Sequence, residues 1–134
     1  MTYTLTIPGV LVGLNEYITA ERSNRYQAAA IKKQTEHAIG AAIRRQLRGV
    51  KITMPVYITY TWIEPTKRRD KDNIAFAKKF VQDALVRAKV IKNDGWKEIA
   101  GFRDCFDVDK AHPRVIVAIE EVNRANGKDG AVSR

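Results

Sequence analysis

The sequence predicts a single small domain of the α/β class, on the border with α+β, in which a mixed β-sheet carries two main helices in the order β-α-β-α-β-β. Three observations predict it: one clean strand-like alternation over residues 54–63, two stretches with helical spacing, and two strand-like segments near the C-terminus. A chain of 134 residues suits one domain whose core folds without disulfides. The β-α-β steps favour right-handed crossovers.

The first strand and the first helix are predicted from residues 3–7 and 22–47. Residues 3–7 alternate and then meet Pro8-Gly9, which is typical of an edge strand that enters a loop. Residues 22–47 are rich in Ala, Gln, Lys and Arg at amphipathic spacing, with Ser23 or Asn24 as the cap and Gly49 at the end. The basic residues of this helix form either a solvated face or a DNA contact, and both interpretations stay open.

The second strand and the second helix enclose the charged part of the sequence. In residues 54–63 the alternation places Met54 and Trp62 on the same side of a strand, and residues 64–66 break it. From residue 73 to about residue 89, apolar side chains recur at helical spacing, which predicts the second helix. The charged segment between strand and helix therefore lies in a loop that leads into a helix.

Two strands near the C-terminus, roughly residues 98–106 and 114–122, complete the predicted sheet. Residues 115–119 are apolar on both faces, which predicts a central position for the last strand. The domain should span residues 1–122. Residues 123–134 contain two glycines and no large apolar residue beyond Val132, so we expect a mobile tail there.

Composition restricts the partners and the compartment. The net charge of +9, from 24 Lys and Arg against 15 Asp and Glu, favours nucleic acid as partner, although basic charge also serves solubility alone. No stretch reaches about 18 consecutive apolar residues and the N-terminus lacks a signal-peptide pattern, so we expect a cytoplasmic protein with no membrane partner. The single cysteine, Cys105, is expected to be a small buried apolar residue.

An acid pair lies within a basic run in residues 67–73 (KRRDKDN), and Asp94 follows 22 residues after Asp72. The run begins like a calcium loop, but Ala75 and Val81 stand where that loop needs Gly and Glu. In an extended loop, Asp70 and Asp72 project the same way, and Asp94 would close the site from the turn after the helix. Three carboxylates suit Mg²⁺ or Mn²⁺. The alternative is that Asp72 or Asn73 only caps the helix.

These residues resemble the signature of the RusA family of Holliday-junction resolvases, small endonucleases of bacteria, phages and prophages. The resemblance rests on residues 68–74 (RRDKDNI), 82–85 (QDAL) and 90–94 (VIKND). A looser likeness lies upstream in residues 24–26 or 14–17, and downstream in residues 112–114. It covers most of the chain up to about Val122. One departure is Asn93, where the family often has another acid before the third aspartate.

The resemblance implies a homodimer that binds four-way DNA junctions and cuts two strands symmetrically, in recombination, repair or phage replication. It implies Mg²⁺, with Mn²⁺ as a substitute, held by three aspartates that fall here on Asp70, Asp72 and Asp94. The essential lysine of the family falls on Lys79. Relative to the family, the helix carries three extra residues between Asp72 and Asp83, nearly one turn, so Lys78 is the fallback. The protein would be bacterial, phage or prophage encoded.

The expected mechanism is hydrolysis of a phosphodiester by a metal-activated water, with Lys79 stabilising the charged phosphate. The side chains expected to contact the DNA backbone are cationic and flank the acids or lie on the helices: Lys67, Arg68, Arg69, Lys71, Lys78 and Arg25. A surface salt-bridge network is the alternative for Arg68 and Arg69. Trp96 and Phe76 would either stack on bases of an opened junction or belong to the core.

Two other classes of function remain open from the sequence. One is a non-catalytic nucleic-acid-binding module, in which the acids only cap helices and balance nearby cations. Such a module predicts salt-sensitive binding without metal-dependent cutting. The other is an enzyme with an Asp-x-Asp metal site that acts on a nucleotide-sugar or another phosphorylated small molecule. The short chain and the lack of a Gly-rich phosphate loop disfavour it.

Overall fold

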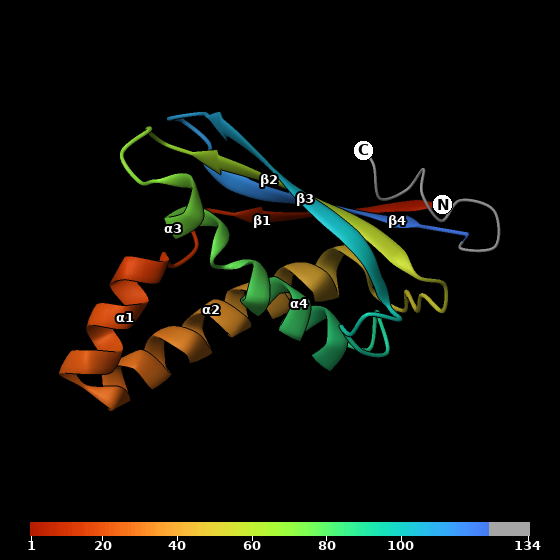
Figure 1. The fold of residues 1–134 in the computed structure, drawn as a ribbon, viewed down its shortest axis with the longest axis horizontal. Helices are drawn as coiled ribbons and strands as arrows, with labels where there is room; N and C mark the ends of the chain where they lie inside the picture. Colours follow the sequence, from red (N-terminus) through yellow and green to blue (C-terminus); the bar gives the residue numbers. More distant parts are fainter. Residues whose placement is uncertain (124–134) are drawn as a thin grey trace.

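The computed structural model describes residues 1–123. These residues fold into a mixed four-stranded β-sheet with helices packed on one face (Figure 1). Apart from Asn123, the predicted mobile tail lies outside the described residues. The elements follow one another as β1 (Thr2–Pro8), α1 (Leu14–Ser23), α2 (Arg25–Gln46), β2 (Val56–Glu64), α3 (Lys71–Ala75), α4 (Lys78–Arg87), β3 (Ile99–Val108) and β4 (Arg114–Glu121). The predicted class and the order of strands are confirmed, with each helical region divided into two helices.

The strands lie in the order β1-β4-β2-β3, with β4 antiparallel to both of its neighbours and β3 parallel to β2. This confirms the central position predicted for the last strand, in which Val115, Val117 and Ile119 are buried. β1 lies at an edge, as predicted. There the side chain of Gln46, at the end of α2, pairs with the backbone N–H and C=O of Thr6, both at 2.7 Å, and so protects the edge strand.

The helical region before β2 begins earlier than predicted. Asn24 caps α2, accepting a hydrogen bond from the Tyr26 N–H at 2.9 Å, as the sequence indicates. The preceding helix α1 was not predicted. Gly13 at its N-cap offers no side-chain bond, so the usual capping signal is missing from the sequence there, and Ala20 is its one buried residue.

The predicted helix from residue 73 to about residue 89 is interrupted, and this is a correction. α3 ends at Ala75 and α4 begins at Lys78. At this junction the N–H groups of Ala77 and Phe80 donate to carbonyls three residues earlier, as in a 3₁₀ turn. The interruption turns Phe76 onto Tyr17 of α1 and Phe80 of α4, with ring centroids 5.6 Å apart in both pairs. Phe76 therefore packs against the core, as one of its two interpretations expected.

The core lies between the sheet and the helices. Val56, Ile58, Tyr60 and Trp62 of β2 face it and are fully buried, as the alternation predicts. Met54, which was expected on the same side, lies before the strand and is 42% exposed, because the strand begins only after Pro55, at Val56. Within residues 1–123, none of the helices combines the length and apolar composition that crossing a membrane requires.

Candidate functional site

The acids of the charged run lie where β2 leads into α3. We call residues 64–73 the acid segment. Asp70 is the N-cap residue of α3 and its backbone C=O accepts from the Ile74 N–H at 3.1 Å, which confirms that the acids open a helix. The capping interpretation named Asp72 or Asn73, whereas the structure gives this position to Asp70 without a side-chain cap bond. Within residues 1–123, the Asp70 carboxylate has neither a hydrogen bond nor an ion pair.

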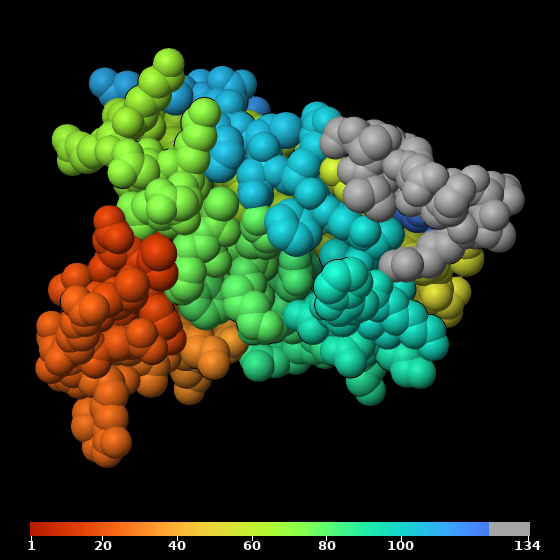
Figure 2. All heavy atoms as spheres, viewed as in Figure 1, coloured from red at the N-terminus to blue at the C-terminus, as the bar shows by residue number. Residues whose placement is uncertain are grey.

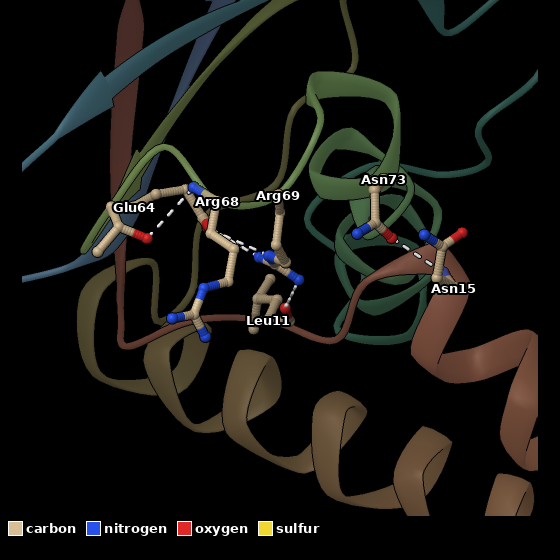
Figure 3. Close-up of polar contacts among 7 residues, drawn as sticks. Leu11, Asn15, Glu64, Arg68, Arg69 and Asn73 are labelled. Carbon is tan, nitrogen blue, oxygen red and sulfur yellow. Dashed lines mark hydrogen bonds and ion pairs between the residues drawn. The ribbon is translucent and has the colours of Figure 1, made fainter.

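Arg69 fixes the acid segment to the rest of the fold (Figure 3). Its Nε and Nη2 atoms donate to the two carboxylate oxygens of Glu64 at 3.0 and 2.8 Å, and its Nη1 donates to the Leu11 carbonyl at 3.2 Å. Both side chains are largely buried, at 22% and 10% exposed. The guanidinium is thus engaged inside the protein, which fits the salt-bridge alternative for Arg69. The Arg68 guanidinium points away from this cluster (Figure 3).

A second contact joins the acid segment to α1. The Asn15 N–H at the start of α1 donates to the Asn73 Oδ1 at 2.9 Å (Figure 3). The approach is close, because a Cβ atom on Gly13 would lie 2.6 Å from Arg69 Nη1 and 2.7 Å from Asn73 Oδ1. Gly13 is therefore required for its small size, so that the start of α1 can lie against the acid segment.

The acid pair opens onto a hollow of about 1090 Å³ between the acid segment and β3. Its lining is strongly charged and includes Lys67, Asp70, Lys71, Asp72, Asp104 and Asp107. Lys71 Nζ lies 5.5 Å from the centroid of the Phe106 ring, in a cation–π contact across the hollow. Both aspartates of the pair thus face an open groove whose lining carries both cations and further carboxylates.

Asp104 is a member of this site that the sequence did not predict. Its Oδ2 lies 2.6 Å from Lys78 Nζ and its Oδ1 accepts from the Trp62 indole N–H at 2.9 Å. Lys78 Nζ also lies 4.1 Å from the Phe102 ring centroid. A signal was present in residues 102–106, where an acid alternates with Phe102 and Phe106 on one side of a strand. Pairing of Asp104 with Tyr60 in the sheet turns that side towards the helices.

Asp94 forms an ion pair with Lys79, the residue that follows Lys78 in α4. Lys79 Nζ lies 3.1 Å from Asp83 Oδ1 and 3.7 Å from Asp94 Oδ2. The hydrogen bond from Lys79 to Asp83, and then the negative charges of Asp83 and Asp94, raise the pKa of Lys79 above its usual value. The Lys79 side chain is 67% exposed. Lys79 and Asp94, which the resemblance assigns to catalysis, are thus neighbours in space. The ammonium group of Lys79 is accessible to a ligand from solvent.

Tyr60 links the Asp104 and Asp94 parts of the site. Its hydroxyl accepts from the Gln82 side-chain amide at 3.0 Å. Burial is the largest cause that raises the pKa of Tyr60 well above its usual value, and the charges of Asp104 and Asp94 add to it, while the Gln82 hydrogen bond opposes the rise. Both carboxylates therefore act on one buried phenol, which stays neutral.

The fit to a divalent cation rests on the acid pair. In residues 1–123, no group of three or more His, Cys, Asp or Glu side chains lies together so that it could hold a metal ion. Asp70 and Asp72 share the hollow, whereas Asp94 lies beside Lys79. Mg²⁺ usually takes one or two protein carboxylates and fills its other positions with water and substrate phosphates, so the acid pair suits it. Figure 2 shows the acid segment and the loop after α4 on one face of the molecule.

The predicted DNA-contacting cations are distributed unevenly. Lys67, Arg68 and Lys71 are exposed on the acid segment or at the start of α3, while Lys78 is held by Asp104. Arg25 lies at the corner between α1 and α2, one length of α1, about 15 Å, from the Asn15 end. If Arg25 contacts a DNA phosphate, that phosphate would therefore lie away from the phosphates near the acid segment.

Comparisons with known proteins leave the chemistry of the site to be argued from its own residues. No protein-family model matches the sequence, and no curated protein does so either. The features of the site that bear on function are the Asp70 carboxylate, which is unpaired among residues 1–123, the charged groove that it lines, and the Lys79–Asp94 pair.

Proposed function

We propose that the protein is a Mg²⁺-dependent endonuclease that cuts branched DNA, of the kind that resolves Holliday junctions, and that it is a member of the RusA family. The observation that carries this proposal is the carboxylate of Asp70, which has no partner within residues 1–123 and lines, together with Asp72, a groove that also holds Lys67 and Lys71. An unpaired carboxylate among cations is a ready ligand for a metal ion that also binds phosphate.

Cations of the acid segment and of α3 are placed to contact a nucleic-acid backbone. Lys67 and Lys71 line the groove and Arg68 is exposed on the acid segment, in a chain whose net charge is +9. These cations attract phosphates and release counterions when they bind, while the aspartates alone would repel DNA. Asp70 and Asp72 would hold a divalent ion, whose positive charge would offset that repulsion.

Asp70 and Asp72 are the residues proposed to hold Mg²⁺, with Asp94 acting beside Lys79. When bound, the ion supplies activation of a water and neutralisation of the leaving oxygen during phosphodiester hydrolysis. The fixed backbone of the acid segment orients both carboxylates before DNA arrives, because Arg69 and Asn73 tie that segment to Leu11 and Asn15. Such preorganisation saves the cost of ordering the site during the reaction.

Lys79, rather than Lys78, is proposed to contact the reacting phosphate. Lys78 Nζ is enclosed by Asp104 and by the Phe102 ring, and its side chain is 18% exposed. Lys79 is largely exposed and remains protonated because Asp83 and Asp94 raise its pKa. A protonated amine that faces solvent can stabilise the negative charge that develops on the phosphate. A homodimer, proposed from the family resemblance, would supply two such sites for paired cuts.

The test is a cleavage assay on a labelled synthetic four-way junction beside a linear duplex of the same sequence, with Mg²⁺ and with EDTA. We expect paired nicks on the junction alone, absent in EDTA and in Asp72→Asn, whose binding to the junction persists. Tight binding of the junction without cutting under any metal would favour the non-catalytic binding module instead. Normal cleavage by Asp70→Asn or Asp72→Asn would disprove the assignment of the site.

A further inference from the structure

Trp96 lies in the loop that joins α4 to β3, and it is 96% exposed. We call residues 92–98 the Asp94 loop. The backbone on both sides of Trp96 is fixed, because the Gly95 N–H donates to Glu98 Oε1 at 3.2 Å and the Ile99 N–H donates to the Gly95 carbonyl at 2.9 Å. The indole is therefore held out into solvent by an ordered turn.

This exposure contrasts with the other tryptophan of the chain. Trp62 is 1% exposed and its indole N–H is bonded to Asp104. Aromatic side chains usually bury 150–250 Å² each in a core or an interface, whereas the Trp96 side chain is almost entirely exposed to solvent. The core interpretation of Trp96 therefore does not hold, and the face of the indole is accessible to a ligand.

The surroundings of Trp96 indicate the chemistry of that ligand. Asp94, two residues away, pairs with Lys79, the residue proposed to contact the phosphate. Lys92 and Lys97 of the same loop are exposed. An exposed aromatic plane among cations is the arrangement with which proteins bind single-stranded nucleic acid, through base stacking and attraction to the backbone.

We propose that Trp96 stacks on an unpaired base next to the cut site and thereby selects branched or open DNA over intact duplex. In a duplex the faces of the bases are covered by their neighbours, whereas a base at an open branch point presents a free face. Trp96 is then a specificity-determining residue. This inference rests on the proposed nuclease function, because it assumes that DNA bound at the acid segment also reaches Lys79 and the Asp94 loop.

The first arm of the test uses tryptophan fluorescence in EDTA, where no cleavage occurs. A single-stranded oligonucleotide is added to wild type and to Trp96→Phe, in which the buried Trp62 is the one remaining indole. Stacking predicts strong quenching in wild type and little in the variant. Equal quenching in both proteins, while the anisotropy of a labelled oligonucleotide shows binding to both, would overturn the inference.

The second arm compares affinities for single-stranded DNA, for a junction with unpaired bases and for linear duplex. Trp96→Ala should bind the first two at least about fivefold more weakly, since each stacked base contributes at least that factor, and duplex binding should not change. Trp96→Phe should retain most of the affinity. Met54→Ala, which removes another exposed apolar side chain, serves as the control. An equal loss on all three DNAs would contradict a role in selection.

The two proposals fail in different ways. If wild type cuts junctions but Trp96→Ala binds all DNAs as wild type does, the inference about Trp96 fails and the nuclease proposal stands. If wild type binds no DNA by anisotropy, both proposals fail together. If it binds DNA with quenching of Trp96 but never cuts, the stacking inference stands without the nuclease.

Discussion

The acid segment and the Asp94 loop both carry aspartates that the sequence singles out, but the fold holds them by different means. The acid segment is tied to distant parts of the chain by the hydrogen bond from Arg69 to the Leu11 carbonyl and by the Asn73–Asn15 bond, while the largely buried Arg69–Glu64 pair holds the segment together. The Asp94 loop is ordered by short-range backbone bonds, and the side chain of Asp94 contacts the exposed Lys79. The position of Asp70 and Asp72 thus depends on tertiary packing, whereas that of Asp94 depends on charge.

The largest effect should come from Lys79, where the two regions of the site are proposed to act on one phosphate. Lys79→Met removes the charge and keeps the aliphatic stem, and we expect junction cleavage to slow by about 10²-fold or more. Lys78→Met is the matched variant. It should lower stability by about 1–2 kcal/mol, because Asp104 loses its partner, and should change the cleavage rate far less.

Single-turnover cleavage and urea denaturation of both lysine variants separate these effects. We assign phosphate binding to the exposed Lys79 and a structural role to the enclosed Lys78. These roles would be reversed if Lys78→Met abolished cutting while Lys79→Met cut normally.

The attachment of the acid segment can be broken at Arg69. Arg69→Leu leaves Glu64 largely buried without its partner and frees the Leu11 carbonyl, so we expect a loss of about 2–3 kcal/mol in the free energy of unfolding. Arg68→Leu, one residue earlier, should change stability by no more than about 0.5 kcal/mol. It should instead weaken DNA binding and reduce its salt dependence. Equal stabilities of the two variants in urea would refute the anchoring role of Arg69.

A smaller effect is expected where α1 approaches the acid segment. Gly13→Ala would place a methyl group 2.6 Å from Arg69 Nη1 and 2.7 Å from Asn73 Oδ1, and relieving these clashes should cost about 1–2 kcal/mol. In Gly40→Ala the nearest atom is Arg44 Nη1 at 3.5 Å, so this change within α2 should stabilise the protein by up to about 1 kcal/mol. Thermal unfolding of the pair should give shifts of opposite sign; shifts of the same sign would mean that the approach at Gly13 is not tight.

The smallest effect on stability is expected at Asp109, which is hydrogen-bonded to residues near it in the sequence. Hydrogen bonds from Arg114, and then from the backbone N–H groups of His112 and Ala111, lower the pKa of Asp109. A lowered pKa adds stability above the pKa of the unfolded chain, and that stability is lost as the pH falls through the folded value. Asp109→Asn should therefore melt slightly below wild type at neutral pH.

At acid pH, below the lowered pKa of Asp109, the melting temperatures of wild type and Asp109→Asn should converge. Cleavage at neutral pH should stay intact, unlike that of Asp70→Asn. A difference in melting temperature that grew at low pH would show that the sign of this effect is wrong.

What could be predicted from the sequence depended on local patterns. Residues adjacent in the sequence determine the alternation in β2, the run of β4 that is apolar on both faces, and the Asn24 cap. Each of these predictions was confirmed. The same holds for the position of Asp70 and Asp72 at the start of a helix, since a strand, a break and a helical pattern follow one another within residues 54–89.

What could not be predicted depended on contacts between distant parts of the chain. Asp104 joins the site because β2 and β3 pair in parallel with Asp104 beside Tyr60, and no local pattern encodes that register. Arg69 looked like a DNA contact until the fold brought it to Glu64 and Leu11. The break after Ala75 follows from the packing of Phe76 on Tyr17 of α1, a contact between residues far apart in the sequence.

The most direct test of the acid pair as the metal site is to locate Mn²⁺ on the protein by the paramagnetic broadening of backbone amide signals. The account predicts that the amides of Asp70 and Asp72 broaden first, that Mg²⁺ reverses the effect, and that Asp70→Asn loses it. Broadening that centres on Asp107 or Asp109, or that persists unchanged in Asp70→Asn, would contradict the account.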